Sequence, residues 1–313
     1  MANIVVVGSA NIDLVLHVDA LPKRGETISG SDIALFPGGK GANQACAAAM
    51  LGARTVCVAR VGQDAYGAML MESLRQAGVD TSAVGRDRRP TGCASIYVLP
   101  DGDNSIVISP GANASLDPET ALSHLKTLSE KDLVLLQLEI PMETVEAVLC
   151  RCKQAGATAV LDPAPARLLL PEVLQQVDYL TPNQTEAAVL LGCADEESID
   201  IPQAARFARD LRKLGAACVV LKLGELGCYV ESGTESCHVP GFPVSALDTT
   251  GAGDVFNAAF AVALSEGKNP LAAAQFANAA AALSVTRHGA QTSIPRRDAV
   301  DGLLDHAASV VVA

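Results

Sequence analysis

The sequence of 313 residues has no tryptophan, and aromatic residues make up only 3% of it. So few aromatic side chains argue against a surface that stacks the bases of single-stranded nucleic acid. Positive charge is also scarce, because 23 Lys and Arg residues face 35 Asp and Glu residues and leave a net charge of −12. Such a surface repels phosphate backbones and anionic lipids, so we expect neither nucleic acid nor a membrane as a partner.

Long apolar runs are missing too, since none approaches the roughly 18 residues of a membrane-spanning helix. The apolar stretch near the N-terminus has no basic region before it and is soon interrupted by Asn11 and Asp13, which does not fit a signal peptide. The nine cysteines are odd in number and include no C-x-x-C pair, and the five histidines show no metal-ligand spacing. These features predict a cytoplasmic protein with reduced thiols.

Apolar residues make up 49% of the chain, which predicts a compact fold. Short apolar runs rich in β-branched residues alternate with Ala-rich helical stretches. This rhythm predicts an α/β three-layer sandwich, in which helices cover both faces of a mainly parallel central sheet. The predicted strands are 4–7, 55–58, 133–136, 159–161, 179–180 and 218–221, and the predicted helices are 42–51, 65–77, 143–155, 184–191, 201–214, 254–265 and 271–286. The tail from residue 298 onward carries no motif.

Two stretches, 14–36 and 91–109, alternate like strands and have no helical period. The turn Leu99-Pro100-Asp101-Gly102 would join two strands of a hairpin. Because both stretches leave the α/β pattern and return to it, they predict a small β-sheet lid inserted into one domain that spans residues 1–313.

The most informative segment is DTTGAGD at 248–254, where a turn of small residues runs directly into an Ala-rich helix. Small residues let the backbone approach a ligand closely, and the N–H groups of a first helical turn favour an anion. Asp254 beside such a cradle would repel phosphate unless it has a chemical task, such as taking a proton from an attacking hydroxyl group as a general base. The alternative is that Asp254 only caps the helix.

A second glycine turn, FPGGKGANQA at 36–45, also opens a helix. It fits neither the G-x-x-x-x-G-K-[ST] phosphate loop nor the G-x-G-x-x-G dinucleotide fingerprint. Phosphate groups must therefore be held in another way.

Together, GGKGANQ at 38–44 and DTTGAGD at 248–254 resemble the two signatures of the ribokinase (PfkB) family of sugar kinases. Supporting matches are GSANID at 8–13, QLE at 137–139, NQTE at 183–186, LGELG at 223–227 and RHGAQ at 287–291, so the resemblance spans nearly the whole chain. It implies ATP-dependent phosphorylation of the 5-hydroxyl of D-ribose. In this scheme Asp254 is the general base, and Gly251, Ala252 and Gly253 form an anion hole for the transferred phosphoryl group.

The resemblance also assigns the sugar site. Its members are Asn11, Asp13, Gly38, Gly39, Lys40, Asn43, Glu139 and Asp254. A polyol needs several fixed donors and acceptors, and this set would supply them. The lid would place Ala94 and Ile96 as an apolar cover over the sugar, and two lids packed together imply a homodimer.

On the nucleotide side, Asn183 and Glu186 match the N-x-x-E pattern that arranges Mg²⁺ and its waters; read alone, they are a helix start and a first-turn acid. The other nucleotide-side matches are Lys222, Gly224, Gly227, Gly253 and Asn278, with Lys222 where the family has Thr. A monovalent cation, usually K⁺, is implied at Asp248 and Thr250 with the carbonyls of Ser284, Arg287, Gly289 and Ser293.

Three other functions stay open at this point. The nearest is a deoxyribokinase or another pentose or nucleoside kinase, although the amide of Asn11 suits a sugar hydroxylated at C2 and C3. A non-catalytic sugar-binding protein would explain the polyol-binding residues but not the DTTGAGD cradle. An NAD-linked dehydrogenase would rest only on the opening strand and Gly8.

Overall fold

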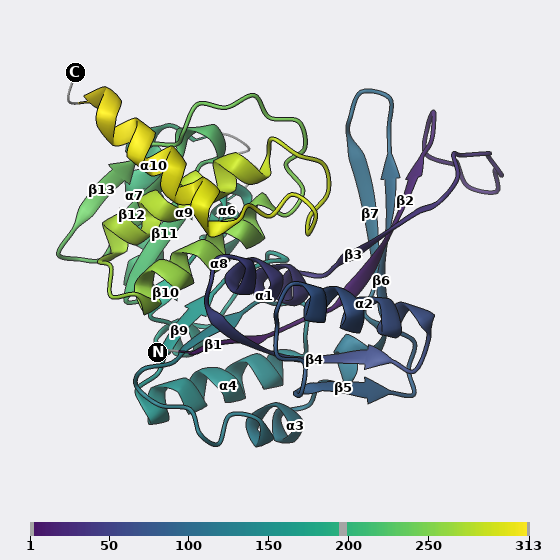
Figure 1. The fold of residues 1–313 in the computed structure, drawn as a ribbon, viewed down its shortest axis with the longest axis horizontal. Coiled ribbons are helices and arrows are strands. Elements are labelled where there is room, and N and C mark those ends of the chain that lie inside the picture. The colour runs from purple at the N-terminus through teal and green to yellow at the C-terminus, as the bar shows by residue number, and fades with distance from the viewer. Residues whose placement is uncertain (1–2, 194–198, 312–313) are drawn as a thin grey trace.

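The structure is a computed structural model that describes residues 3–193 and 199–311. Within these residues the strands form a large sheet and a separate small one (Figure 1). The large sheet has the order β13-β12-β11-β10-β9-β8-β1-β4-β5 and is parallel from β11 to β5. Its strands are β1 (Asn3–Val7), β4 (Arg54–Gly62), β5 (Val84–Asp87), β8 (Leu133–Leu136), β9 (Thr158–Leu161), β10 (Tyr179–Leu180), β11 (Cys218–Lys222), β12 (Cys228–Glu231) and β13 (Ser236–Val239).

Helices cover both faces of this sheet and bury alternate residues of each strand. Ile4 and Val6 of β1 belong to one buried cluster, whereas Val5 and Val7 belong to the other. The first cluster is completed by α1 (Lys40–Met50), α2 (Ala65–Gln76), α8 (Ala252–Ser265), α9 (Pro270–Ser284) and α10 (Arg297–Val311). The second is completed by α3 (Pro118–Ser123), α4 (Met142–Ala155), α5 (Pro171–Leu174), α6 (Gln184–Leu190) and α7 (Ile201–Lys213). The predicted three-layer α/β sandwich is confirmed.

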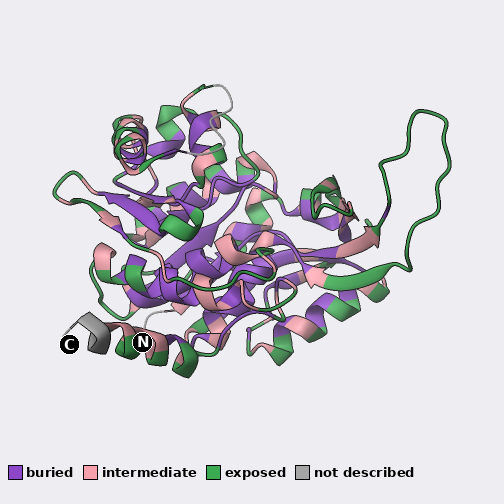
Figure 2. Cartoon of the chain, turned by 90° about the horizontal axis from the view of Figure 1, so that it is seen from above, coloured by how far each residue is buried: buried purple, intermediate pink, exposed green. Residues whose placement is uncertain are grey.

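The small sheet has the order β3-β2-β6-β7 and lies beside the large unit (Figure 1). Its strands are β2 (Asn11–His17), β3 (Ala34–Gly38), β6 (Gly92–Val98) and β7 (Asn104–Ser109). The Gly102 N–H donates to the Leu99 carbonyl at 3.0 Å, which confirms the predicted hairpin turn. The β2 strand begins at Asn11, earlier than the predicted boundary at residue 14. The predicted sugar-binding residues Asn11 and Asp13 therefore belong to the small sheet. Figure 2 shows that the loop between β2 and β3 is exposed.

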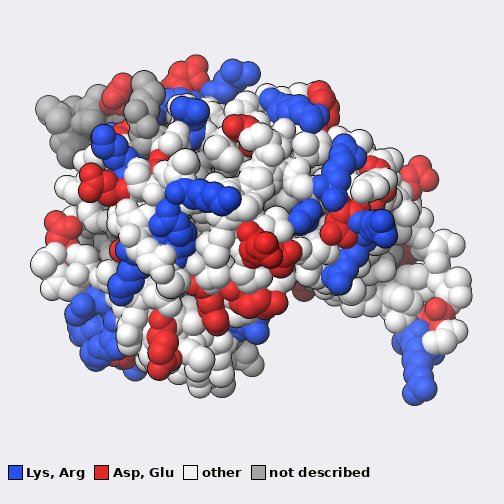
Figure 3. Space-filling model, turned by 90° about the horizontal axis from the view of Figure 1, so that it is seen from below, with Lys and Arg blue, Asp and Glu red and all other residues white. Residues whose placement is uncertain are grey.

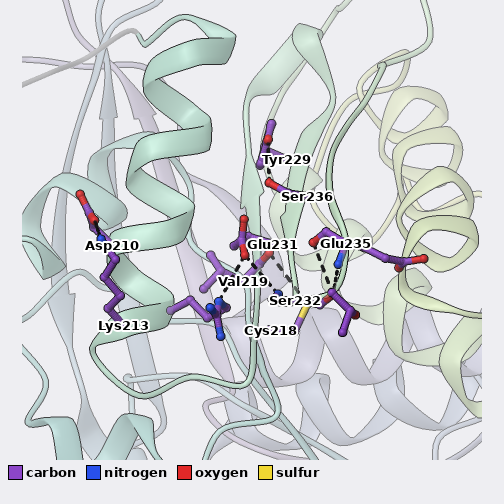
Figure 4. Close-up of polar contacts among 12 residues, drawn as sticks. Asp210, Lys213, Cys218, Val219, Tyr229, Glu231, Ser232, Glu235 and Ser236 are labelled. Carbon is purple, nitrogen blue, oxygen red and sulfur yellow. Dashed lines mark hydrogen bonds and ion pairs between the residues drawn. The ribbon is translucent and has the colours of Figure 1, made fainter.

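The antiparallel edge formed by β12 and β13 was not predicted. Figure 4 shows its polar contacts, among them the Tyr229 hydroxyl and the Ser236 hydroxyl at 3.0 Å. Glu231 on β12 is buried and pairs with Arg212 of α7 at 3.2 Å. The α10 helix was not predicted either, because the sequence from residue 298 onward showed no motif; in the structure it packs against α9.

On the face drawn in Figure 3, basic and acidic side chains lie interspersed. Among the described residues, no helix is long and apolar enough to cross a membrane. Every cysteine of the chain lies in the described part and is a free thiol.

Candidate active site

The predicted site residues gather where the parallel strands of the large sheet end at their carboxyl termini. Asn11 follows β1, Glu139 follows β8, Asn183 follows β10, and Lys222 is the last residue of β11. The N-termini of α1 and α8 meet at the same edge, where these two helices pack against each other. Open α/β sheets bind their ligands at this edge, because successive strands deliver side chains there from distant parts of the sequence.

Asp254 lies inside the first turn of α8, not before it. The N-cap is Gly251, whose φ of 75° is in the left-handed region that favours glycine, and the helix begins at Ala252. The predicted helix start at Asp254 is therefore wrong, as is the alternative that Asp254 is the cap. The Ala252 N–H donates to the Thr249 carbonyl at 3.2 Å, and this bond closes the turn ahead of the helix.

The carboxylate of Asp254 is buried and held by two amide side chains from α1. Asn43 Nδ2 donates to Oδ2 at 2.9 Å, and Gln44 Nε2 donates to Oδ1 at 3.0 Å. Burial raises the pKa of Asp254, and the nearby carboxylate of Asp162 raises it further, while Lys40 and the two amides oppose the shift. A carboxylate whose pKa is raised toward the working pH is a better proton acceptor than an exposed one.

Glu139 and Asn11 are joined in one hydrogen-bonded group. Glu139 Oε2 accepts from the Ser9 hydroxyl at 2.5 Å and from Asn11 Nδ2 at 3.4 Å. Asn113 Nδ2 donates to Asn11 Oδ1 at 2.7 Å, which fixes the orientation of the Asn11 amide. The site thus keeps amide donors and carboxylate acceptors in set positions.

Asp13 lies at the junction of the two sheets, paired with Phe36 across β2 and β3. Burial raises its pKa to about 7, and the charges of Glu139 and Asp254 add to the effect. A Cβ on Gly38 would lie 2.3 Å from Asp13 Oδ2, so only glycine fits beside this carboxylate. Gly39 has a φ of 88°, and it turns the chain into α1.

Lys40 is the first residue of α1 and faces several acidic groups. Burial alone would lower its pKa, but the carboxylates of Asp254, Asp162 and Glu139 hold the pKa above its usual value. Lys40 therefore stays cationic and offsets part of the negative charge of the site.

Asn183 and Glu186 form a capping box at the start of α6. Asn183 Oδ1 accepts from the Glu186 N–H at 2.8 Å, and Glu186 Oε2 accepts from the Asn183 N–H at 2.7 Å. Burial raises the pKa of Glu186, and Lys222 opposes that shift. The interpretation of these residues as a helix start is thus correct, and the carboxylate of Glu186 is buried.

The other residues predicted to bind the nucleotide come from four parts of the chain: the end of β11, the loop before β12, the first turn of α8, and α9. Gly224 and Gly227 bound the short 3-10 helix 224–226, with φ values of 62° and 90°. Asn278 Nδ2 donates to the carbonyls of Val239 and Pro240 at 3.0 and 3.1 Å, so its amide nitrogen holds the chain after β13. Lys222 Nζ lies 3.1 Å from Asp162 Oδ1.

Asp248 connects the turn before α8 to the loop after α9. Its Oδ1 accepts from the Thr250 N–H at 2.9 Å and its Oδ2 from the Gly289 N–H at 2.8 Å. Burial alone would raise the pKa of Asp248, but these bonds hold it below its usual value, so the carboxylate is ionised. One carboxylate beside a loop with backbone and hydroxyl oxygens suits a large, weakly charged cation, and no cluster of three His, Cys, Asp or Glu side chains occurs in the described ranges.

Two residues at the centre of the site were not predicted. Gln44 Nε2 donates to both Asp254 Oδ1 and Asp162 Oδ2, and Gln44 Oε1 accepts from Gln137 Nε2 at 2.7 Å. Asp162 directly follows the predicted strand 159–161, and this position at the carboxyl end of a parallel strand could have identified it. Gln44 belongs to the GGKGANQ motif at 38–44, but the resemblance assigned no function to it.

Comparison with known proteins gives consistent results over the whole chain. The model of the pfkB family carbohydrate kinases matches residues 1–297. The chain is 43% identical to a ribokinase of Bacillus subtilis over 97% of its length and 100% of that protein, and 36% identical to a deoxyribokinase of Salmonella typhi over 94% and 95%. The structure of Arabidopsis thaliana ribokinase complexed with ribose and ATP aligns with a TM-score of 0.87 at 38% identity, covering 97% of this chain and 99% of that one.

The residues that meet at the buried carboxylate of Asp254 lie 210 and 211 positions from it in sequence. The chain that brings them together matches known sugar kinases over nearly all of its length. The chain therefore belongs to the pfkB family of carbohydrate kinases and is a sugar kinase.

Proposed function

We propose that this kinase transfers the γ-phosphoryl group of ATP to the 5-hydroxyl of D-ribose, giving D-ribose 5-phosphate. The observation that carries the proposal is the buried carboxylate of Asp254, held by Asn43 and Gln44 in the first turn of α8. Two relatives support ribose and ATP as the substrates. One is a ribokinase at 43% identity, and the other is a ribokinase whose structure contains ribose and ATP.

In the proposed reaction, Asp254 accepts the proton of the 5-hydroxyl while the oxygen of that hydroxyl bonds to the γ-phosphorus. The bond from the γ-phosphorus to the β–γ bridging oxygen breaks, and ADP leaves with that electron pair. The turn Gly251 to Gly253, at the positive end of α8, stabilises the charge on the transferred group. The raised pKa of Asp254 favours the proton transfer.

The sugar hydroxyl groups are bound by the group around Glu139 and Asp13. Asn11 and Lys40 donate, whereas Glu139 and Asp13 accept, and Gly38 and Gly39 leave room for close approach. Ala94 of β6 is buried, and Ile96, two residues further along the same strand, is half-buried, which supports their role as the apolar cover of the sugar.

The triphosphate would lie between the residues proposed to bind the sugar and those proposed to bind the nucleotide. Asn183 and Glu186 would orient the water shell of Mg²⁺, which neutralises phosphate charge when bound. Lys222, Gly224, Gly227, Gly253 and Asn278 are the proposed nucleotide contacts. K⁺ would bind at Asp248 and Thr250 with the carbonyls of Ser284, Arg287, Gly289 and Ser293, and the ionised carboxylate of Asp248 supports this site.

The proposal includes a cytoplasmic homodimer that associates through the small sheet. Its β7 strand exposes neighbouring apolar residues, with Ile106, Val107 and Ile108 having exposed fractions of 52%, 64% and 43%. Such a contiguous apolar strand is typical of an interface between copies.

The decisive experiment compares kcat/KM for ribose and 2-deoxyribose, with ADP release as the readout in Mg²⁺ and K⁺. We expect ribose to be preferred by at least tenfold, because the deoxy sugar would leave the second N–H of the fixed Asn11 amide without a partner. Asn11→Ala is expected to remove most of this preference, while Ser129→Ala, far from the site, serves as the matched control. Equal values with the wild-type enzyme would contradict the ribose assignment and favour the deoxyribokinase alternative.

A further inference from the structure

The ion pair between Lys222 and Asp162 lies beside the first turn of α8, at Gly253. Lys222 Nζ and Asp162 Oδ1 are 3.1 Å apart, and the two side chains are only 12% and 4% exposed. Lys222 ends β11 and Asp162 follows β9, with β10 between these strands. The pair therefore bridges two strand ends across the edge where the site is built.

The ammonium group of Lys222 lies against the proposed anion hole. A Cβ added to Gly253 would be 3.5 Å from Lys222 Nζ, which is van der Waals contact. Gly253 is in the first turn of α8, next to Asp254. A cation at this place adds to the positive end of the helix and faces the position that an arriving phosphoryl group would take.

Asp162 is held from its other side by the same amide that holds the base. Its Oδ2 accepts from Gln44 Nε2 at 3.1 Å, and that nitrogen also donates to Asp254 Oδ1. Asp162 therefore cannot turn without disturbing these contacts, and the Lys222 ammonium is fixed relative to Asp254. Lys222 carries three N–H donors, so it can keep its bond to Asp162 and donate another to a phosphoryl oxygen.

A buried ion pair is a poor source of stability, since desolvation offsets most of the attraction. The chain also lacks the lysine of a G-x-x-x-x-G-K-[ST] phosphate loop, so its cation for phosphate must come from elsewhere. We propose that Lys222 is a further catalytic residue, whose ammonium contacts the phosphoryl group during transfer, and that Asp162 is the positioning residue that holds it there. This inference rests on the proposed phosphoryl transfer and not on the identity of the sugar.

The test uses Lys222→Met, Asp162→Asn and the double variant. We expect Lys222→Met to lower kcat by about 10² to 10³, the usual effect of removing one donor to a transition-state anion, with the Kd of ribose unchanged. Asp162→Asn is expected to lower kcat by about tenfold, because the ammonium remains but is held less firmly. The double variant should lower kcat about as much as Lys222→Met does, because the loss of the ammonium contact is the larger of the two effects.

Lys222→Met alone leaves an unpaired buried carboxylate and so weakens the fold, whereas the double variant removes both charges and is the safer one to measure. Lys213→Met is the matched control, since Lys213 pairs with Asp210 on the exposed side of α7 at 2.8 Å. This control should keep wild-type kcat. A folded double variant with kcat within threefold of the wild type would overturn the proposal.

A binding measurement separates this inference from the proposed function. ADP with aluminium fluoride and Mg²⁺ imitates the phosphoryl group in transfer. We expect the double variant to lose at least 30-fold more affinity for the aluminium fluoride complex than for ADP alone. Unchanged affinity for that complex would overturn the role of Lys222, even if no pentose is phosphorylated; failure of the wild type to phosphorylate any pentose would overturn the proposed function alone.

Discussion

Replacing Asp254 with Asn tests the chemistry with little change in shape. In the wild type, both carboxylate oxygens accept a hydrogen bond, one from Asn43 and one from Gln44. An asparagine keeps one acceptor and turns its NH₂ group toward the other donor, so one of the two bonds is lost. The perturbation therefore removes the proton acceptor and one hydrogen bond to its carboxylate.

The two consequences differ in magnitude, which makes them separable. A general base contributes roughly 10² to 10⁴ in rate, or about 2.7 to 5.5 kcal/mol at 1.36 kcal/mol per decade. The lost hydrogen bond to the carboxylate costs about 2 kcal/mol of stability, and removal of a buried charge offsets part of that cost. In a chain of this size, a net change of about 1 kcal/mol shifts Tm by only about 2 °C.

Three measurements on the purified variant decide the outcome. A coupled ADP assay gives kcat, calorimetric titration gives the Kd of ribose, and thermal unfolding gives Tm. We expect kcat to fall by at least 100-fold, with Kd and Tm close to those of the wild type. If kcat falls less than tenfold, or if a variant with wild-type Tm no longer binds ribose, Asp254 is not the base.

The remaining predictions concern the sugar, the cation and the dimer. Burial raises the pKa of Asp13 to about 7, so below that pH the carboxyl group is protonated and accepts hydrogen bonds from sugar hydroxyls less well. The KM for ribose should therefore fall as pH rises through about 7. Asp13→Asn should abolish this change in KM, and a change that persists in the variant would assign it to another group. Replacing K⁺ with Na⁺ should lower kcat in the wild type but not in Asp248→Ala, and equal rates in the wild type would remove the cation site. Val107→Glu should convert a dimer to a monomer in light scattering while leaving Tm within about 2 °C; a variant that remains dimeric would exclude the small sheet as the interface.

Much of the fold is encoded in local patterns. The β-branched runs at 4–7 and 133–136 are strands in the structure because a strand buried on both faces needs continuous apolar residues. The antiparallel edge of β12 and β13 had no such signal, since its side chains are mixed in polarity and its pairing depends on contacts such as that of Glu231 with Arg212. The α10 helix, which packs against α9, was also missed.

The motifs also indicated where the candidate site lies. A glycine turn before a helix determines where backbone N–H groups gather, so the region of Asp254 was recognisable from sequence. The local boundary was not, because the left-handed conformation of Gly251 allows α8 to begin before Asp254, and this is a property of the turn as folded.

The sequence by itself determined the types of residue at each end of the chain and the order of strands and helices that carries them. Only the tertiary structure decided that Gln44 bridges Asp162 and Asp254, that Lys222 turns to Asp162, and that burial raises the pKa values of Asp13 and Asp254. The physical reason is that local patterns encode which groups are present, whereas distance and exclusion of water set how strongly charges act on one another, and both arise only when segments far apart in sequence pack together.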